Sequence, residues 1–183
     1  MSSENHKPKI VDVDVIDENE NRDARKKDAP KIIALPPNIL LVMIVAGLVL
    51  NWLFPVSFGH MWGGAGLMIL GLSIGLIFWC KILFDRAETN IRPDLPTHAI
   101  VTEGPFKYSR NPIYLAFLLG FSGLAMLADA PIMLLLLPIL WFVLERYVIR
   151  PEEEYLAEKF GEEYTDYMGR TNRWVGVKQD FFS

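Results

Sequence analysis

Two groups of polar and charged residues in this chain could do chemistry, and each adjoins an apolar run. The first group lies in EGPFKYSRNPIY, residues 103–114, where one apolar run begins: Tyr108, Arg110, Asn111 and Tyr114. The second group lies in LERYVIRPEE, residues 144–153, where another apolar run ends: Glu145, Arg146, Arg150, Glu152 and Glu153. Carboxylates can bind cations or move protons, and guanidinium groups can orient a carboxylate or phosphate as an ion pair.

Other kinds of site are excluded by residue type and spacing. The chain has no zinc-ligand spacing, no Ser/His/Asp set, no P-loop and no glycine-rich dinucleotide turn, so we expect no metal site. The lone Cys80 cannot form an internal disulfide and lies inside an apolar run, which favours a packing role. A net charge of −4 without a basic stripe argues against a nucleic-acid partner.

Four apolar runs predict an all-α integral membrane protein with about four transmembrane helices. The runs at 38–54 and 62–80 have close to the ~20 residues that a bilayer core requires. The run at 113–128 is shorter, and the run at 132–149 has Pro138 at its middle, where we expect a kink. With their flanks, the predicted helices cover about 36–55, 62–84, 112–128 and 131–149. A soluble helical bundle is the weaker alternative, because the second and fourth runs are apolar on all sides.

The short connector Asp129-Ala130-Pro131 makes the third and fourth helices an antiparallel hairpin. The start of the third helix and the end of the fourth must therefore lie side by side. This brings the two polar groups together at one membrane interface. Within this region, irregular backbone over 98–112 is tolerable only if it is buried in protein or lines a cavity.

The distribution of charge predicts the orientation. All 18 Lys and Arg residues lie in or beside three segments, namely the N-terminal tail, 81–112 and 146–178. The connectors at 55–61 and 129–131 have none. An even number of spans with this bias predicts a multi-pass protein of a plasma or inner membrane with both termini in the cytoplasm.

The remaining segments divide the chain into a tail and one domain. Residues 1–31 carry seven Lys/Arg and eight Asp/Glu with few large apolar residues, which predicts a disordered cytoplasmic tail before a membrane domain over 32–183. Residues 151–168 predict a C-terminal interfacial helix with an aromatic face, with Gly161 as a weak point or boundary. The second helix has a small-residue face for close helix packing, made by Gly63, Gly64, Ala65, Gly66, Gly71, Ser73 and Gly75, in which Gly71 and Gly75 form a GxxxG pair. Arg170, Arg173 and Trp174 suit a headgroup region.

From composition alone, the polar residues could equally anchor the helices at lipid headgroups. The string PTHAIVTEGPFKYSRNPIY, followed by RPEEEYLAEKFGEEYTDYMGRTNRW, favours function, because it resembles a superfamily of integral-membrane methyltransferases. These are the isoprenylcysteine carboxyl methyltransferases and phospholipid methyltransferases. The chain departs from the eukaryotic pattern at Asn111, where those enzymes have His.

The resemblance implies a cytoplasmic pocket for S-adenosylmethionine. It assigns cofactor binding to ten residues: His98, Ala99, Ile100, Val101, Phe106, Asn111, Pro112, Ile113, Tyr114 and Glu152. It also associates an arginine near the end of the last membrane helix with the acceptor, and leaves Arg146 and Arg150 both open.

The resemblance thus implies methyl transfer from S-adenosylmethionine to a hydrophobic, membrane-resident acceptor, in the manner of the isoprenylcysteine enzymes. We expect Arg110 to organise the loop or the cofactor carboxylate, and Glu153 to support the site or act as a base. A carboxylate acceptor would favour the arginines, whereas a phospholipid amine would favour a glutamate base, and the sequence leaves both open. A non-catalytic membrane scaffold is the alternative from another class.

Overall fold

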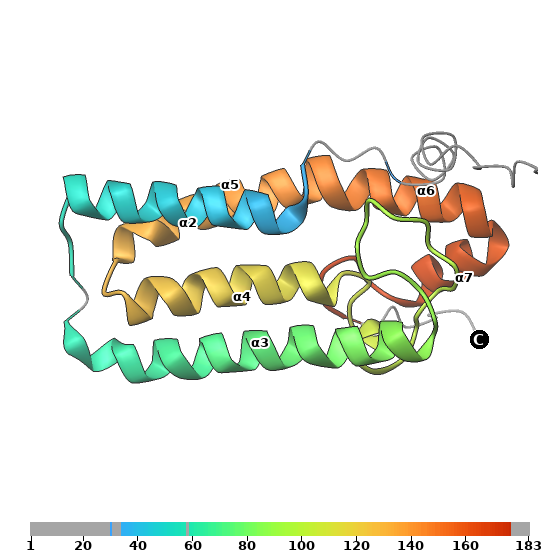
Figure 1. Cartoon of the computed structure of the whole chain (residues 1–183), viewed down its shortest axis with the longest axis horizontal. Helices are drawn as coiled ribbons and strands as arrows, with labels where there is room; N and C mark the ends of the chain where they lie inside the picture. The colour runs from blue at the N-terminus through green and yellow to red at the C-terminus, as the bar shows by residue number, and fades with distance from the viewer. Residues whose placement is uncertain (1–29, 31–33, 58, 177–183) are drawn as a thin grey trace, which may run out of the picture.

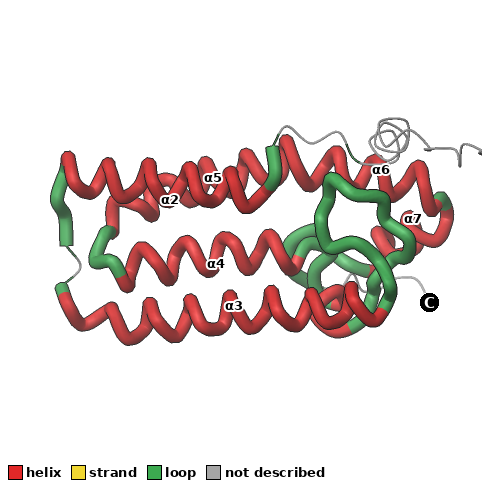
Figure 2. The backbone as a smooth tube through the Cα atoms, in the orientation of Figure 1, coloured by secondary structure: helices red, strands yellow, loops and turns green. Residues whose placement is uncertain are grey.

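The computed structural model describes residues 30, 34–57 and 59–176. The predicted tail over 1–31 therefore lies outside the described residues, apart from Pro30. In the described part all regular elements are helices, joined by loops, and no strand is present (Figure 2), which confirms the all-α prediction.

Four rods of helix run along the long axis of the molecule (Figure 1). The first three are α2 (Pro36–Leu53), α3 (Gly63–Arg86, preceded by the 3-10 turn His60–Trp62) and α4 (Pro112–Leu127). The fourth is continuous from Pro131 to Phe160. It comprises a 3-10 segment η3 (Pro131–Leu136), α5 (Leu137–Leu144), a π-helical turn η4 (Glu145–Ile149) and α6 (Arg150–Phe160). The helix α7 (Glu162–Arg170) then folds back.

Three of these rods are long and apolar enough to cross a membrane, namely α2, α3 and the rod that begins at Pro131. The helix α4 is equally apolar but shorter, as the 113–128 run predicted. Large apolar side chains on α2 and α3 remain exposed, including Leu41, Val45 and Phe78. Because such surface is stable only in lipid, the chain is an all-α membrane protein.

The close pairing of α3 with α4 uses glycines, although not the pair that the sequence singled out. A Cβ on Gly66 would lie 2.5 Å from the Leu127 amide nitrogen and 2.7 Å from the Gly123 carbonyl oxygen. Gly71 and Gly75 have nothing within 4 Å of an added Cβ. Gly66 and Ser73 of the predicted small-residue face therefore contact α4, whereas no described atom lies against Gly71 or Gly75.

The α4–α5 hairpin forms as predicted, with Asp129 at a positive φ of 49° in the tight connector. Phe121 of α4 packs against Met133, Leu140 and Leu144 of the following rod, and all four are almost fully buried. The irregularity expected at Pro138 appears as a change from 3-10 to α-helix between Leu136 and Leu137. Proline removes a backbone donor at this point, so the ladder of hydrogen bonds is interrupted there.

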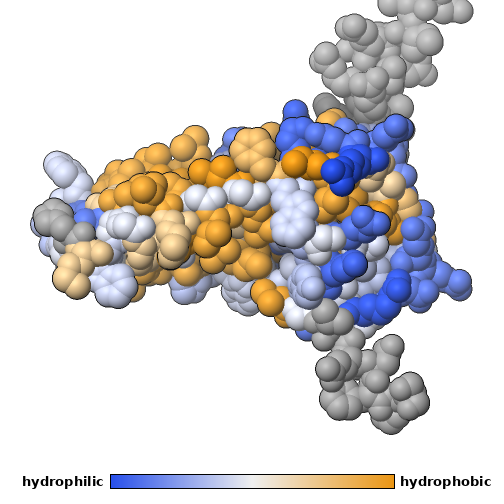
Figure 3. Space-filling model, turned by 90° about the horizontal axis from the view of Figure 1, so that it is seen from below, coloured by the Kyte–Doolittle hydropathy of each residue, from blue (hydrophilic) through white to orange (hydrophobic). Residues whose placement is uncertain are grey.

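Polar residues gather at one end of the bundle, where the 87–111 loop, α6 and α7 lie (Figure 3). The predicted 151–168 helix is two helices, because Gly161 adopts a φ of 56° that ends α6 and starts α7. Its aromatic face contacts the loop: the Tyr167 hydroxyl donates to the Phe106 carbonyl at 2.7 Å. The Tyr155 hydroxyl accepts from the Thr97 amide at 3.3 Å.

Candidate active site

A cavity of about 600 Å³ opens at the polar end, within the range typical of small-molecule sites. Its walls come from α2, the 90–101 segment, the first turn of α4, α6 and α7. The start of α4 and the start of α6 therefore meet as the hairpin predicted, and most of the walls are apolar.

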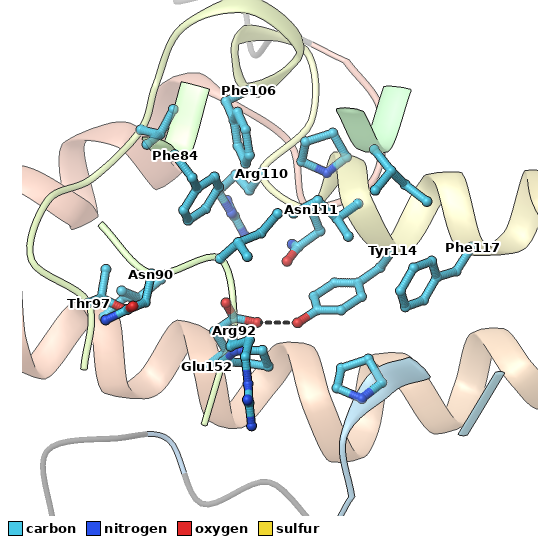
Figure 4. Close-up of a pocket in the computed structure, with 18 of the residues that line it drawn as sticks. Phe84, Asn90, Arg92, Thr97, Phe106, Arg110, Asn111, Tyr114, Phe117 and Glu152 are labelled. Carbon is cyan, nitrogen blue, oxygen red and sulfur yellow. Dashed lines mark hydrogen bonds between the residues drawn. The ribbon is translucent and has the colours of Figure 1, made fainter. Parts of the chain in front are cut away.

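Tyr114 and Glu152 face each other in this cavity (Figure 4). The Tyr114 hydroxyl donates to Glu152 Oε2 at 2.7 Å. Pro112 begins α4 and places Tyr114 in its first turn, whereas Pro151 places Glu152 in the first turn of α6. Glu152 accepts from no other described residue, and no described cation lies within ion-pair distance of it. Its second oxygen is free to bind a ligand.

Glu153 is held quite differently, because both of its carboxylate oxygens are occupied. Oε1 accepts from Arg110 Nε at 3.0 Å and Nη2 at 2.8 Å, and from Asn111 Nδ2 at 3.3 Å. Oε2 accepts from Arg173 Nη2 at 2.7 Å and Nε at 2.9 Å. The Glu153 and Arg110 side chains are only 7% and 6% exposed. Glu153 is therefore a buried carboxylate with both oxygens paired to guanidinium groups.

Arg110 is committed to the protein in the same way. Beyond its pair with Glu153, its Nη1 donates to the Met168 and Thr171 carbonyls at 3.2 and 2.9 Å. These bonds tie the segment before α4 to the end of α7. Arg110 lines the cavity, but its guanidinium nitrogens donate to Glu153 and to backbone carbonyls of the cavity wall. This supports the loop-organising role expected for it.

Arg173 and Trp174 belong to this network as well. Arg173 Nη1 donates to Glu145 Oε1 at 2.8 Å, and Trp174 Nε1 donates to Glu145 Oε2 at 2.6 Å. The Glu153 carboxylate beside Arg173 raises the pKa of its guanidinium above the usual range. The predicted place of Arg173 and Trp174 near lipid headgroups stays a prediction. Sequence reasoning missed their role in the network because the partners Glu145 and Glu153 lie about 20 to 28 residues earlier in the chain.

Two tyrosines of α7 close the wall beside Glu153. Tyr164 and Tyr167 are buried, and this burial raises the pKa of both hydroxyls well above the usual range, so both remain protonated. Phe106, in the same buried cluster, forms an edge-to-face pair with Phe84 at 5.5 Å between ring centroids, and both rings line the cavity. The cavity thus offers flat apolar surfaces close to the free carboxylate.

The structure brings together nine of the ten residues that the resemblance assigned to the cofactor. Those that line the cavity are Ala99, Ile100, Val101, Phe106, Asn111, Pro112, Ile113, Tyr114 and Glu152. His98 does not line it: its side chain is exposed, and its amide donates to Thr89 Oγ1 at 2.8 Å. The α2 residues Leu40, Leu41 and Ile44 also line it, and only the folded chain could reveal them.

Arg146 and Arg150 lie outside the cavity. Arg150 Nη2 pairs with Glu145 Oε1 at 3.2 Å and is about half exposed, whereas the Arg146 guanidinium lies 5.9 Å from the Tyr147 ring centroid. Neither side chain reaches the residues that surround Glu152. The expectation that one of them faces an acceptor in this cavity finds no support in the geometry.

The fold and the cavity define an all-α membrane protein with a small-molecule site at its polar end, and comparison with known sequences identifies its family. The sequence model of the phospholipid methyltransferase family matches residues 60–163, which is more than half of the chain. The chain belongs to this family. The described part of the matched region contains α3, α4, the fourth rod and most of the cavity wall.

Individual relatives include both resistance proteins and a methyltransferase. The cobalt-zinc-cadmium resistance protein CzcN of Cupriavidus metallidurans is 28% identical over 124 residues, 62% of this chain and 53% of that protein. The nickel-cobalt-cadmium resistance protein NccN of Alcaligenes xylosoxydans xylosoxydans is 25% identical over 60% of this chain and 50% of its own length. The protein-S-isoprenylcysteine O-methyltransferase of Saccharomyces cerevisiae is 37% identical over 44% of this chain and 33% of its length. The chain spans about half the length of the two resistance proteins it matches.

Proposed function

We propose that the protein is an integral-membrane methyltransferase that transfers a methyl group from S-adenosylmethionine to a hydrophobic, membrane-resident acceptor. The observation that carries the proposal is the free Glu152 carboxylate in an otherwise largely apolar cavity. A carboxylate removed from water without a cationic partner is costly, so such a site favours a ligand that brings its own positive charge.

The cavity residues fit such a methyl donor. Glu152 Oε1 can pair with an ammonium group, while the Asn111 side chain keeps its carbonyl oxygen, since its Nδ2 already donates to Glu153 and to the Arg173 carbonyl. Phe84 and Phe106 offer flat apolar faces for an adenine ring. We call the cavity wall made by Glu152, Asn111, Phe106 and residues 99–101 the donor site. When bound, S-adenosylmethionine would supply an electrophilic methyl group on a cationic sulfur.

The apolar part of the cavity supports a lipid-like acceptor. From the donor site the lining continues along Leu40, Leu41 and Ile44 of α2, which is long and apolar enough to cross a membrane, and Phe117 of the shorter apolar helix α4. An acyl or prenyl chain could lie there without leaving an apolar environment, while its polar head reaches the donor site. The chain's residues would then contribute by holding both reactants in line and by excluding water.

The placement of cations favours an amine acceptor, as in a phospholipid headgroup, over a carboxylate. Among the described lining residues, the two arginines already face carboxylates: Arg110 pairs with Glu153 and Arg92 with Asp94 at 2.6 Å. Arg146 and Arg150 lie elsewhere. In the described lining an acceptor carboxylate would meet no unoccupied cation, whereas an uncharged amine needs none.

The proposal extends to topology. The 32–183 segment would form a single membrane domain, with the donor site and both termini on the cytoplasmic side of a plasma or inner membrane. This follows from the absence of Lys and Arg in the connectors at 55–61 and 129–131. A water-soluble donor would then enter from the cytoplasm, and the acceptor would enter from the bilayer.

Ligand binding tests the donor. The protein purified in detergent should be stabilised against heat by S-adenosylmethionine and by its demethylated product, S-adenosylhomocysteine, in proportion to saturation. Adenosine of equal concentration is the matched control, because it lacks the ammonium group expected to reach Glu152. Folded protein that shows no shift at millimolar ligand would instead support the non-catalytic scaffold.

Product analysis tests the acceptor. Membranes that contain the protein should transfer label from methyl-labelled S-adenosylmethionine to an extractable lipid, and membranes with Glu152→Gln should not. Label that survives mild base identifies an N-methylated headgroup, whereas label released by base as methanol identifies a carboxyl methyl ester. The second outcome would overturn the preference for an amine and retain the methyltransferase.

A further inference from the structure

We infer that Arg173 is a positioning residue of the donor site, although it touches no part of the cavity itself. The inference rests on the proposed function, because it concerns how the free carboxylate of Glu152 is kept facing the ligand. Among the residues lining the cavity, Arg173 is absent, whereas its partner Glu153 is present.

The first step concerns the two adjacent glutamates on α6. Neighbouring residues on an α-helix point about 100° apart, so fixing the direction of one fixes the direction of the other. Two nitrogens of Arg173 donate to Glu153 Oε2, at 2.7 and 2.9 Å, and Arg110 donates to Glu153 Oε1 from the α4 side. With Glu153 held between two guanidinium groups, Glu152 is the glutamate that faces the cavity.

The second step concerns the backbone around Arg173. Its carbonyl accepts from Asn111 Nδ2 at 3.2 Å and from Ser109 Oγ at 3.4 Å. Its neighbours also pair with the same segment, because the Arg110 amide donates to the Asn172 carbonyl at 3.0 Å and the Gly176 amide to the Tyr108 carbonyl at 2.7 Å. We call residues 171–176 the C-terminal strap. The strap supports the 108–111 segment, from which Asn111 forms part of the donor site.

The third step concerns the second carboxylate that Arg173 holds. Glu145 lies in the π-helical turn before α6, with a side chain only 12% exposed, and accepts from Arg173 Nη1 at 2.8 Å. Trp174 binds the other oxygen of Glu145. Arg173 therefore links the strap, the π-helical turn and α6 at once. If the charge of Arg173 were removed, the cation left beside Glu145 would be Arg150, which is half exposed and lies 3.2 Å away.

These contacts lead to a specific expectation for ligand affinity. A hydrogen bond to a charged group is worth roughly tenfold or more in affinity, so releasing Glu153 and the 108–111 segment together should weaken donor binding strongly. Lysine at position 173 would keep the charge but could not contact both carboxylates with a planar fork of nitrogens. Its effect should therefore lie between those of arginine and glutamine.

The test measures S-adenosylhomocysteine binding by calorimetry in detergent at a temperature where each variant is fully folded. We expect Arg173→Gln to weaken binding by about tenfold to a hundredfold and Arg173→Lys by about threefold to tenfold. Arg170→Gln is the matched control, since Arg170 is exposed and its Nε donates only to the Asp166 carbonyl within its own helix. This control should bind within about twofold of the unchanged protein.

Amide exchange supplies a readout that does not depend on the ligand. In Arg173→Gln, peptides covering residues 108–111 should exchange faster than in the unchanged protein, and they should be unaffected in Arg170→Gln. If Arg173→Gln does not fold, the same comparison with Arg173→Lys decides, because its graded loss of affinity is predicted as well.

The possible failures are distinguishable. An unchanged protein that does not bind S-adenosylhomocysteine would overturn the proposed function and this inference with it. If the unchanged protein binds S-adenosylhomocysteine and both Arg173→Gln and Arg173→Lys bind it with the same affinity as the unchanged protein, only the role of Arg173 is overturned. Faster exchange with unaltered affinity would show that the strap is structural, and would likewise overturn the inference.

Discussion

At the scale of single residues, two adjacent glutamates with the same chemistry have different partners and should have different roles. Glu152 has one hydroxyl partner and faces a cavity, whereas Glu153 is buried between Arg110 and Arg173. This difference in partners can be tested by replacing each glutamate with glutamine, which has nearly the same shape and no charge.

Glu152→Gln should abolish donor binding while leaving the fold intact, because it removes a charge that no described cation balances. Glu153→Gln should instead lower the free energy of unfolding by about 3 to 5 kcal/mol, because it leaves two guanidinium groups without their shared carboxylate. Calorimetric binding and thermal unfolding, measured on both variants, check the contrast. Similar stability losses in the two variants would contradict the assignment.

Tyr114→Phe tests the only described contact of the free carboxylate. The change deletes the hydroxyl that donates to Glu152 at 2.7 Å and keeps the ring that packs against Phe117. A hydrogen bond to a charged group contributes about 1.5 kcal/mol or more, so donor affinity should fall by roughly tenfold. Phe117→Leu, which perturbs the same ring pair without touching Glu152, is the control. Equal affinity losses in both variants would show that packing and not the hydroxyl matters.

The sequence could predict much of the site at this scale, but not which groups are free. Motif order placed Arg110, Asn111, Tyr114 and Glu152 together, and the short 129–131 connector explained why they meet. The state of Glu153 depends on Arg173, whose position relative to α6 follows from the reversal of the chain at Gly161. No local pattern contains that information, because the partners meet only after the chain has folded back.

At the scale of helices, the number, length and hairpin of the apolar segments followed from hydropathy and connector length. Hydropathy could not predict which face of each helix packs against which neighbour, because a helix that is apolar on all sides has no stripe that marks its buried side. The glycines show this: of those on α3, Gly66 meets the α4 backbone, whereas Gly71 and Gly75 point outward.

Alanine substitution at these glycines measures the difference. Gly66→Ala should lower the free energy of unfolding by about 1 to 3 kcal/mol, because its methyl group would overlap the Leu127 nitrogen and the Gly123 oxygen, which are backbone atoms and cannot move aside cheaply. Gly71→Ala meets open space and should be neutral, or stabilising by up to about 1 kcal/mol through helix propensity. Denaturant titration in mixed micelles gives both values. A larger loss for Gly71→Ala would place the α3–α4 contact on the other face.

At the scale of the whole molecule, the fold separates an apolar bundle from a polar end that holds the cavity (Figure 3). The two ends must face different aqueous compartments if the rods cross a bilayer. The connectors at 55–61 and 129–131 meet at the far end, where Ser57 Oγ donates to Asp129.

Cysteine labelling tests the proposed orientation. In a Cys80→Ala background, Ser57→Cys should react with a membrane-impermeant maleimide in intact cells, because exposed Ser57 lies in a connector without Lys or Arg. Glu103→Cys, exposed at the polar end, should react only after the membrane is opened. The reverse pattern would put the cavity outside the cytoplasm, away from the expected supply of S-adenosylmethionine, and would contradict the proposed topology and the donor together. Labelling of both positions after lysis controls for accessibility, so that a negative result in intact cells reports the membrane and not burial.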